Sequence, residues 1–168
     1  MLQPLSVAAG KFALKRKSLE QEVCPIARSL DQIGDWWTLL IIRNALHGAK
    51  RFGEFQKDLG VSKSMLAERL RRMVDDGLLE QHTDPSRSAY SEYYLTEKGR
   101  RLWMVLVAIR QWGEAHLFED GEPMQVMQDR KDGAAIQRLA VIAADGRVLD
   151  QSDTEIRIGA ASGDPRRN

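Results

Sequence analysis

The fold is decided by residues 51–99, which read RFGEFQKDLGVSKSMLAERLRRMVDDGLLEQHTDPSRSAYSEYYLTEKG. The stretch begins with a predicted short helix over residues 51–59, which Gly60 ends. Its apolar side chains recur at spacings of three and four, as on one face of a helix: Phe52, Phe55 and Leu59. This short helix is the first half of a pair.

A second helix is predicted from Ser62 to residue 76, just before Gly77. Serine is a favoured N-cap residue, because its hydroxyl accepts a hydrogen bond from a backbone N–H of the first turn. One stripe of this helix is apolar and is expected to face the core: Leu66, Leu70 and Val74, with Met73 beside them. Two helices of unequal length joined by a glycine-containing turn are typical of a helix-turn-helix.

A β-hairpin is expected directly after this pair of helices. Residues 78–82 and 90–95 are strand-like, and residues 84–88 between them have the composition of a turn. A hairpin in this position is a wing. The predicted fold class is therefore mainly α with a β-hairpin wing (α+β), a winged helix-turn-helix.

Two further helices are predicted ahead of the quoted stretch. Pro25 suits the first turn of a helix from Cys24 to about residue 32, since its missing N–H costs nothing there. Asp35 can then cap a helix over residues 36–46. We expect residues 1–21 to form an N-terminal arm and residues 22–116 to form the winged helix-turn-helix domain.

The last long helix is predicted from its cap, Thr96, to residue 116. Its middle, residues 102–109, is apolar all round, and such a helix is buried on more than one side. Because so small a domain cannot wrap it, we expect a homodimer through this helix, helped by residues 11–30. The expected interface residues are Leu102, Trp103, Leu106, Ile109 and Trp112.

The final segment, residues 117–168, has a different composition and is expected to be a small β-rich extension. Short strands are predicted over residues 139–143 and 154–158, around a turn at Asp145-Gly146. Residues 163–168 are expected to be disordered.

Composition restricts the class of protein. The hydrophobic content of 43% is typical of a soluble globular domain, and no apolar run is long enough to span a membrane, so a cytoplasmic location is expected. The single cysteine excludes an internal disulfide framework. The net charge of +1 does not by itself indicate nucleic acid, but residues 1–19 and 100–112 carry basic and no acidic side chains.

No catalytic constellation is recognisable in the sequence. It contains no nucleophile–base pair and no glycine-rich phosphate loop, and its three histidines are not at metal-ligand spacing. We therefore expect no enzymatic activity, no metal and no cofactor.

Several short matches, in this order and with these gaps, resemble the HxlR family of transcriptional regulators over about residues 22–116. The matching residues are Cys24-Pro25, Leu30–Gly34, Trp37-Thr38, Arg51-Phe52, Gly60–Ser62, Leu66, Arg69-Leu70, Gly77-Leu78, Tyr94–Thr96 and Gly99. The resemblance implies a winged-helix homodimer that binds double-stranded operator DNA. Residues 117–168 lie outside the usual domain, and they lack the cysteines with which some longer relatives could hold zinc.

With the apolar stripe turned inward, Lys63, Ser64, Arg69 and Arg72 are expected to project outward, where the N-terminal residues of a recognition helix meet base edges. The wing is expected to meet the adjacent groove or backbone. The expected DNA contacts are Lys50, Arg51, Ser62, Lys63, Ser64, Arg69, Arg72, Arg87 and Ser88. Basic side chains on a helix surface usually serve only to solvate it. A winged helix that binds only protein is therefore the alternative function.

Cys24 is the one residue with redox chemistry of its own. At a helix N-terminus the dipole favours the thiolate, and the family resemblance implies a sensor of oxidants or electrophiles. The alternative is a small buried hydrophobic side chain that packs the arm. A small-molecule effector pocket among the four tryptophans is also possible, because regulators often keep one at an interface.

Overall fold

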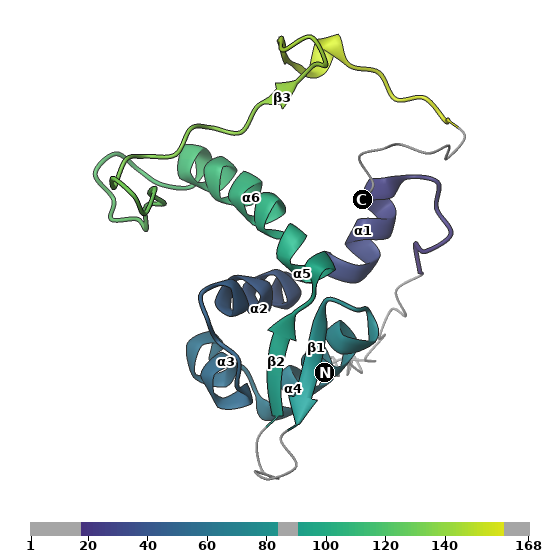
Figure 1. The fold of residues 1–168 in the computed structure, drawn as a ribbon, viewed down its shortest axis with the longest axis vertical. Helices are drawn as coiled ribbons and strands as arrows, with labels where there is room; N and C mark the ends of the chain where they lie inside the picture. The colour runs from purple at the N-terminus through teal and green to yellow at the C-terminus, as the bar shows by residue number, and fades with distance from the viewer. Residues whose placement is uncertain (1–17, 84–90, 160–168) are drawn as a thin grey trace, which may run out of the picture. The chain divides into compact units, whose positions relative to one another are not determined.

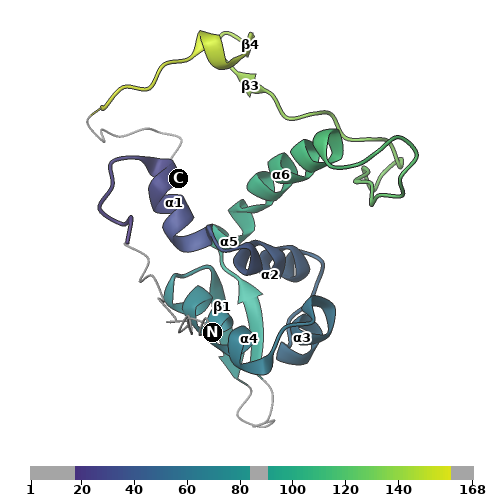
Figure 2. The ribbon, with the colours of Figure 1, turned by 180° about the vertical axis from the view of Figure 1, so that it is seen from behind.

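The computed structural model describes residues 18–83 and 91–159. The chain divides into two compact units, residues 1–34 and 35–168, and each is described by itself. Figure 1 and Figure 2 show the helices and strands from opposite sides. None of the described helices has the length and apolar character needed to cross a membrane.

The first unit contributes the helix α1 (Pro25–Ile33), which begins at the proline as expected. Cys24 occupies the N-cap position with extended backbone, and its side chain makes no capping hydrogen bond. The N–H of Gly34 donates to the carbonyl of Leu30 over 2.9 Å and closes the helix. Ahead of α1, the hydroxyl of Ser18 donates to Asp31 over 2.9 Å, which ties the preceding residues to the helix.

The second unit is built around α2 (Trp36–Leu46). Asp35 caps this helix, because its carboxylate accepts hydrogen bonds from the N–H groups of Trp37 (2.7 Å) and Thr38 (3.2 Å). Ile41 and Ile42 are almost completely buried. The helix contacts α3, α4, α5, α6 and β2, so it forms the central element of the core.

The helix pair consists of α3 (Phe52–Leu59) and α4 (Lys63–Asp75). Gly60 ends α3 with a φ of 64°, in the left-handed region that favours glycine. The pair packs through side chains that are at most 1% exposed: Phe55, Leu66, Leu70 and Met73. Val74, expected on the same stripe, is only partly buried.

The wing begins with the antiparallel strands β1 (Leu79–Thr83) and β2 (Ser91–Leu95), paired from Leu79 opposite Leu95 to Thr83 opposite Ser91. The N–H of Tyr93 donates to the carbonyl of Lys50 over 2.8 Å, and Arg51 forms an isolated bridge with Glu92. The base of the wing is thereby attached to the start of α3. Residues 84–90, which include the predicted contacts Arg87 and Ser88, lie outside the described residues.

The long C-terminal helix is two helices, α5 (Glu97–Arg101) and α6 (Trp103–His116), so the prediction of a single helix is wrong. The N–H of Leu102 bonds to the carbonyl of Gly99 rather than one residue further back, which tightens the last turn of α5. Gly99 is buried against the start of β1: a Cβ there would lie 2.2 Å from the carbonyl oxygen of Leu78. We attribute the break to this close docking of α5 on the hairpin.

Two opposite faces of α6 differ in their surroundings. Val107 is buried, and at helical spacing it shares one face with Trp103, Leu106 and Arg110. The opposite face, here called the outer stripe, exposes 38–58% of each of three apolar residues, Val105, Ile109 and Trp112, with Met104 at its edge. The five residues expected at the dimer interface therefore do not all share a face, because Trp103 lies opposite Trp112.

The extension after α6 has little regular structure. Its strands β3 (Val141–Ile142) and β4 (Val148–Leu149) pair around the predicted turn at Asp145-Gly146, and the 3₁₀ helix η1 (Gln151–Asp153) follows. The prediction of a strand over 154–158 is wrong. Ile156 and Ile158 are 99% and 89% exposed, so no neighbouring strand or apolar surface among the described residues holds that segment in a ladder.

Candidate nucleic-acid interface

The exposed side of α4 is the surface on which DNA contacts were predicted. Burial of Leu66, Leu70 and Met73 turns the opposite side of the helix to solvent. The exposed residues of α4 are Lys63, Ser64, Met65, Ala67, Glu68, Arg71, Arg72 and Asp75. Lys63, Ser64 and Arg72 are therefore accessible to solvent, Lys63 and Ser64 in the first turn of the helix and Arg72 more than two turns later.

The N-terminus of α4 is fixed by Ser62. Its hydroxyl accepts a hydrogen bond from the N–H of Met65 (3.3 Å) and lies 3.3 Å from the hydroxyl of Ser64. The side chain of Ser62 therefore acts as the helix cap. The first N–H groups of a helix have no carbonyl partner within it, so this end is suited to a phosphate.

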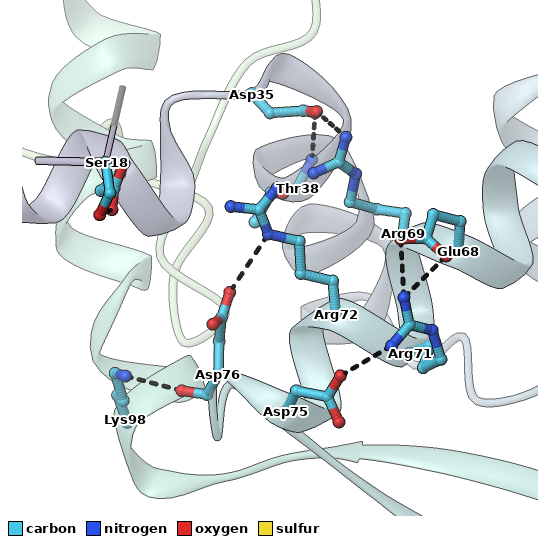
Figure 3. Close-up of polar contacts among 11 residues, drawn as sticks. Ser18, Asp35, Thr38, Glu68, Arg69, Arg71, Arg72, Asp75, Asp76 and Lys98 are labelled. Atoms are coloured by element: carbon cyan, nitrogen blue, oxygen red, sulfur yellow. Dashed lines mark hydrogen bonds and ion pairs between the residues drawn. The ribbon is translucent and has the colours of Figure 1, made fainter. Parts of the chain in front are cut away.

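Arg69 does not project outward, and that part of the prediction is wrong. Its guanidinium forms an ion pair with Asp35, and both side chains are only about one fifth exposed (20% and 21%). In Figure 3, Arg69 reaches from α4 to the carboxylate that also caps α2. The pair joins the two helices, because Asp35 accepts from α2 and from Arg69 at once. The apolar periodicity of the helix placed Arg69 beside the core stripe. It could not predict that Asp35, at the start of another helix, would lie within reach of the guanidinium.

The sequence analysis did not predict the ion pairs that Arg71 forms on the exposed side of α4. Arg71 donates to both carboxylate oxygens of Glu68 (2.8 and 2.9 Å) and to Asp75 (3.2 Å), as Figure 3 shows. Hydrogen bonding and the charge of Arg71 hold the pKa of Glu68 below its usual value. The spacing of three and four residues is the signal that could have revealed this cluster. Arg71 thus compensates part of the negative charge that Glu68 and Asp75 place on this side of α4.

Arg72 lies one turn beyond Arg69 on the exposed side. Its side chain is 53% exposed, and its Nε lies 3.9 Å from the carboxylate of Asp76. The carbonyl of Asp76 in turn accepts a hydrogen bond from Lys98 over 2.7 Å. This geometry leaves Arg72 accessible to a backbone phosphate, at the cost of a weak exposed ion pair.

Lys50 and Arg51 lie where the start of α3 meets the wing. The ammonium of Lys50 lies 4.9 Å from the ring centroid of Tyr94, and Arg51 pairs with Glu92 over 3.1 Å. Hydrogen bonds from Tyr94 and Arg51 lower the pKa of Glu92. Both cations are exposed, and both are held by residues of β2.

Cys24, in the first unit, is exposed, so the alternative that it is a buried packing residue is wrong. Arg28, one turn further along α1, donates to the carbonyl of Glu22. Among the described residues no group of three or more histidine, cysteine or acidic side chains could hold a metal ion.

A family model described as HxlR-like helix-turn-helix matches residues 32–120, more than half of the chain. The chain belongs to this family. An uncharacterized HTH-type transcriptional regulator of Mycobacterium tuberculosis is 39% identical to this HxlR-like protein over 105 residues, which cover 60% of this chain and 65% of the relative. The regulator YdeP of Bacillus subtilis is 33% identical over 107 residues, which cover 63% and 84%. The chain thus spans about 65% of the length of the mycobacterial relative.

Solved structures extend the likeness to the fold. The HxlR-like protein resembles the crystal structure of PA1607, a candidate transcription factor. The TM-score is 0.79, and the identity is 46% over 84% of this chain and 99% of that one. The HxlR-like protein also resembles the reduced form of the redox regulator HypR, with a TM-score of 0.52 and 30% identity over 56% and 94%. These findings confirm the predicted family and the predicted fold class.

Proposed function

We propose that this HxlR-like regulator binds its operator as a homodimer, with α4 of each subunit in the major groove and the wing against the adjacent groove or backbone. The observation that carries the proposal is the exposed face of α4, where Lys63 and Ser64 stand at the N-terminus beside the Ser62 cap. The N-terminal residues of a recognition helix are those that reach base edges.

The proposal divides the contacts into two kinds. Lys63 and Ser64 are assigned to bases or to the nearest phosphate, whereas Arg72, Lys50 and the N-terminus of α4 are assigned to the backbone. We leave Arg69 out of this set, because its guanidinium is engaged by Asp35. Arg51, paired with Glu92, would have to exchange that carboxylate for a phosphate.

The experiment is selection of binding sites from a pool of random duplexes, followed by fluorescence anisotropy with the selected and a scrambled duplex. A symmetric dimer should select an inverted repeat, with half-sites about one helical turn apart or a multiple of it. The selected duplex should bind about a thousandfold tighter than the scrambled one, and both affinities should fall steeply with salt. Selection of a single unrepeated half-site would contradict the dimeric part of the proposal.

Dimerisation is assigned to α6 because its outer stripe is otherwise an exposed apolar surface. Scattered apolar residues on a surface need no explanation, but Val105, Ile109 and Trp112, at spacings of four and three on one helix face, form a continuous strip. The same strip on a second copy is its natural cover, since a twofold interface pairs a surface with itself.

The proposal also includes regulation through Cys24. Its thiol is exposed at the N-terminus of α1, where it is accessible to an oxidant or an electrophile. Because the chain has one cysteine, a disulfide would have to join two chains or a chain and a small thiol. The likeness to the redox regulator HypR supports this part of the proposal.

A further inference from the structure

A cavity of about 770 Å³ lies between the last turn of α2, the side of α6 opposite the outer stripe, and the segment 125–130. Its volume falls in the range of small-molecule sites, about 300–1,000 Å³. Because the outer stripe faces the other way, dimerisation through that stripe does not by itself cover this cavity.

The segment that closes the cavity is tied to α6 by side chains of two consecutive residues. Arg110 donates to the carbonyl of Gln125 over 2.7 Å. Gln111 donates to the carbonyl of Gln137 (3.0 Å) and accepts from the N–H of Leu139 (2.7 Å). Between these ties the chain folds back on itself, with Gln128 bridged to Ala135. The cavity wall is therefore held in place at both ends.

The charge of the cavity lining is one-sided. Arg43, Arg110 and Arg130 contribute three guanidinium groups, His47 adds an imidazole, and no aspartate or glutamate is among the described lining residues. Arg43 donates twice to the neutral side-chain oxygen of Asn44 (3.0 and 2.9 Å), so this partner leaves its charge uncompensated. Of these three arginines, only Arg110 forms an ion pair within the part of the chain that the structure describes, with the carboxylate of Glu114 at 3.3 Å.

Most of the remaining lining is apolar. It consists of one large aromatic ring, Trp103, with Leu46, Leu106, Val107, Val126 and Met127, beside the neutral side chains of Gln125 and Gln128. A highly charged ligand would leave this wall uncovered, and an uncharged apolar ligand would leave the guanidinium groups without a counter-charge. The lining fits a molecule with one acidic group and an apolar body.

We infer that this cavity binds a small monocarboxylate with an apolar body, its carboxylate between Arg43 and Arg130 and its body against Trp103. A guanidinium matches a carboxylate in shape as well as in charge, since it can donate two parallel hydrogen bonds. A role of this ligand as an effector of DNA binding rests on the proposed function. Binding of the ligand to the cavity is independent of that function.

The test is isothermal titration of the full-length protein, without DNA, using octanoate and 1-octanol, which share an apolar body and differ in charge. Octanoate should bind at least about tenfold tighter than octanol. Arg43→Gln should weaken octanoate binding about tenfold, and Arg130→Gln, at an exposed position, about threefold. Neither substitution should change octanol binding, whereas Trp103→Ala should weaken both ligands.

Arg138→Gln is the matched control, because Arg138 is an exposed arginine of the same extension that does not line the cavity. It should bind octanoate as the unchanged protein does. Equal affinity for octanoate and octanol, absence of octanoate binding, or an equal loss in Arg138→Gln and Arg130→Gln would overturn the assignment. Since Arg130 is exposed, Arg130→Gln is expected to fold, and it tests carboxylate binding even if Arg43→Gln folds poorly. No DNA is present, so a failed operator experiment would leave this result unaffected.

Discussion

At the scale of single residues, Gly99 has the strictest requirement. It combines ordinary helical backbone with no room for a side chain, because the nearest atom to an added Cβ is a backbone oxygen, that of Leu78. Gly99→Ala should therefore push α5 away from β1 and destabilise the protein by about 1–3 kcal/mol or more. Thermal or denaturant unfolding measures this change.

Gly53 is the control for that substitution. It also lies in a helix, α3, but an added Cβ would meet nothing within 4 Å. Gly53→Ala should be neutral or should stabilise the protein by about 0.5–1 kcal/mol, because alanine favours helix. Equal destabilisation by both substitutions would show that the close approach at Gly99 is not the cause.

Arg69 is the second residue whose role the structure decides differently from the sequence. Arg69→Met keeps the aliphatic stem but leaves Asp35 without its partner, so it should lower stability by about 1 kcal/mol. The ratio of affinities for operator and scrambled DNA should not change. A stable variant with a reduced ratio would return Arg69 to the set of base contacts.

At the scale of elements, the outer stripe of α6 carries the prediction about assembly. Ile109→Arg places a charge in the proposed interface and should convert the dimer to a monomer by light scattering. Ile158→Arg makes the same chemical change at an exposed isoleucine of the extension and should leave the dimer intact. A dimer that survives Ile109→Arg would mean that subunits associate through another surface.

The sequence predicted helices well where local signals agreed. Asp35 and Ser62 are true caps, Gly60 and Gly77 have positive φ, and the bounds of α2 are those expected. The predictions from sequence were wrong where the local structure depends on a residue far away in the chain. The break at Leu102 follows from the docking of Gly99 on Leu78, and the missing strand at 154–158 follows from the lack of a partner. Likewise, the orientation of Arg69 is set by Asp35, on another helix.

At the scale of the whole molecule, the proposed DNA-binding surface belongs to one unit and the proposed sensor, Cys24, to the other. A quinone should release operator DNA from the unchanged protein but not from Cys24→Ser, which keeps the size of the side chain and removes the thiolate. Anisotropy before and after treatment measures the release. Equal release from both proteins would exclude Cys24 from regulation.

If α4 reads the base sequence, changes to its exposed residues should alter the ratio of the affinities for the selected and the scrambled duplex. Anisotropy should be measured with the selected and the scrambled duplex at one fixed salt concentration. Substitution of Lys63 and Ser64 by alanine should weaken binding to the selected duplex by about 1–3 kcal/mol for each base that α4 no longer reads, and should affect the scrambled duplex much less. Arg72→Ala should weaken both duplexes alike. If the Lys63 and Ser64 substitutions also weakened both alike, α4 would not be the element that reads the operator.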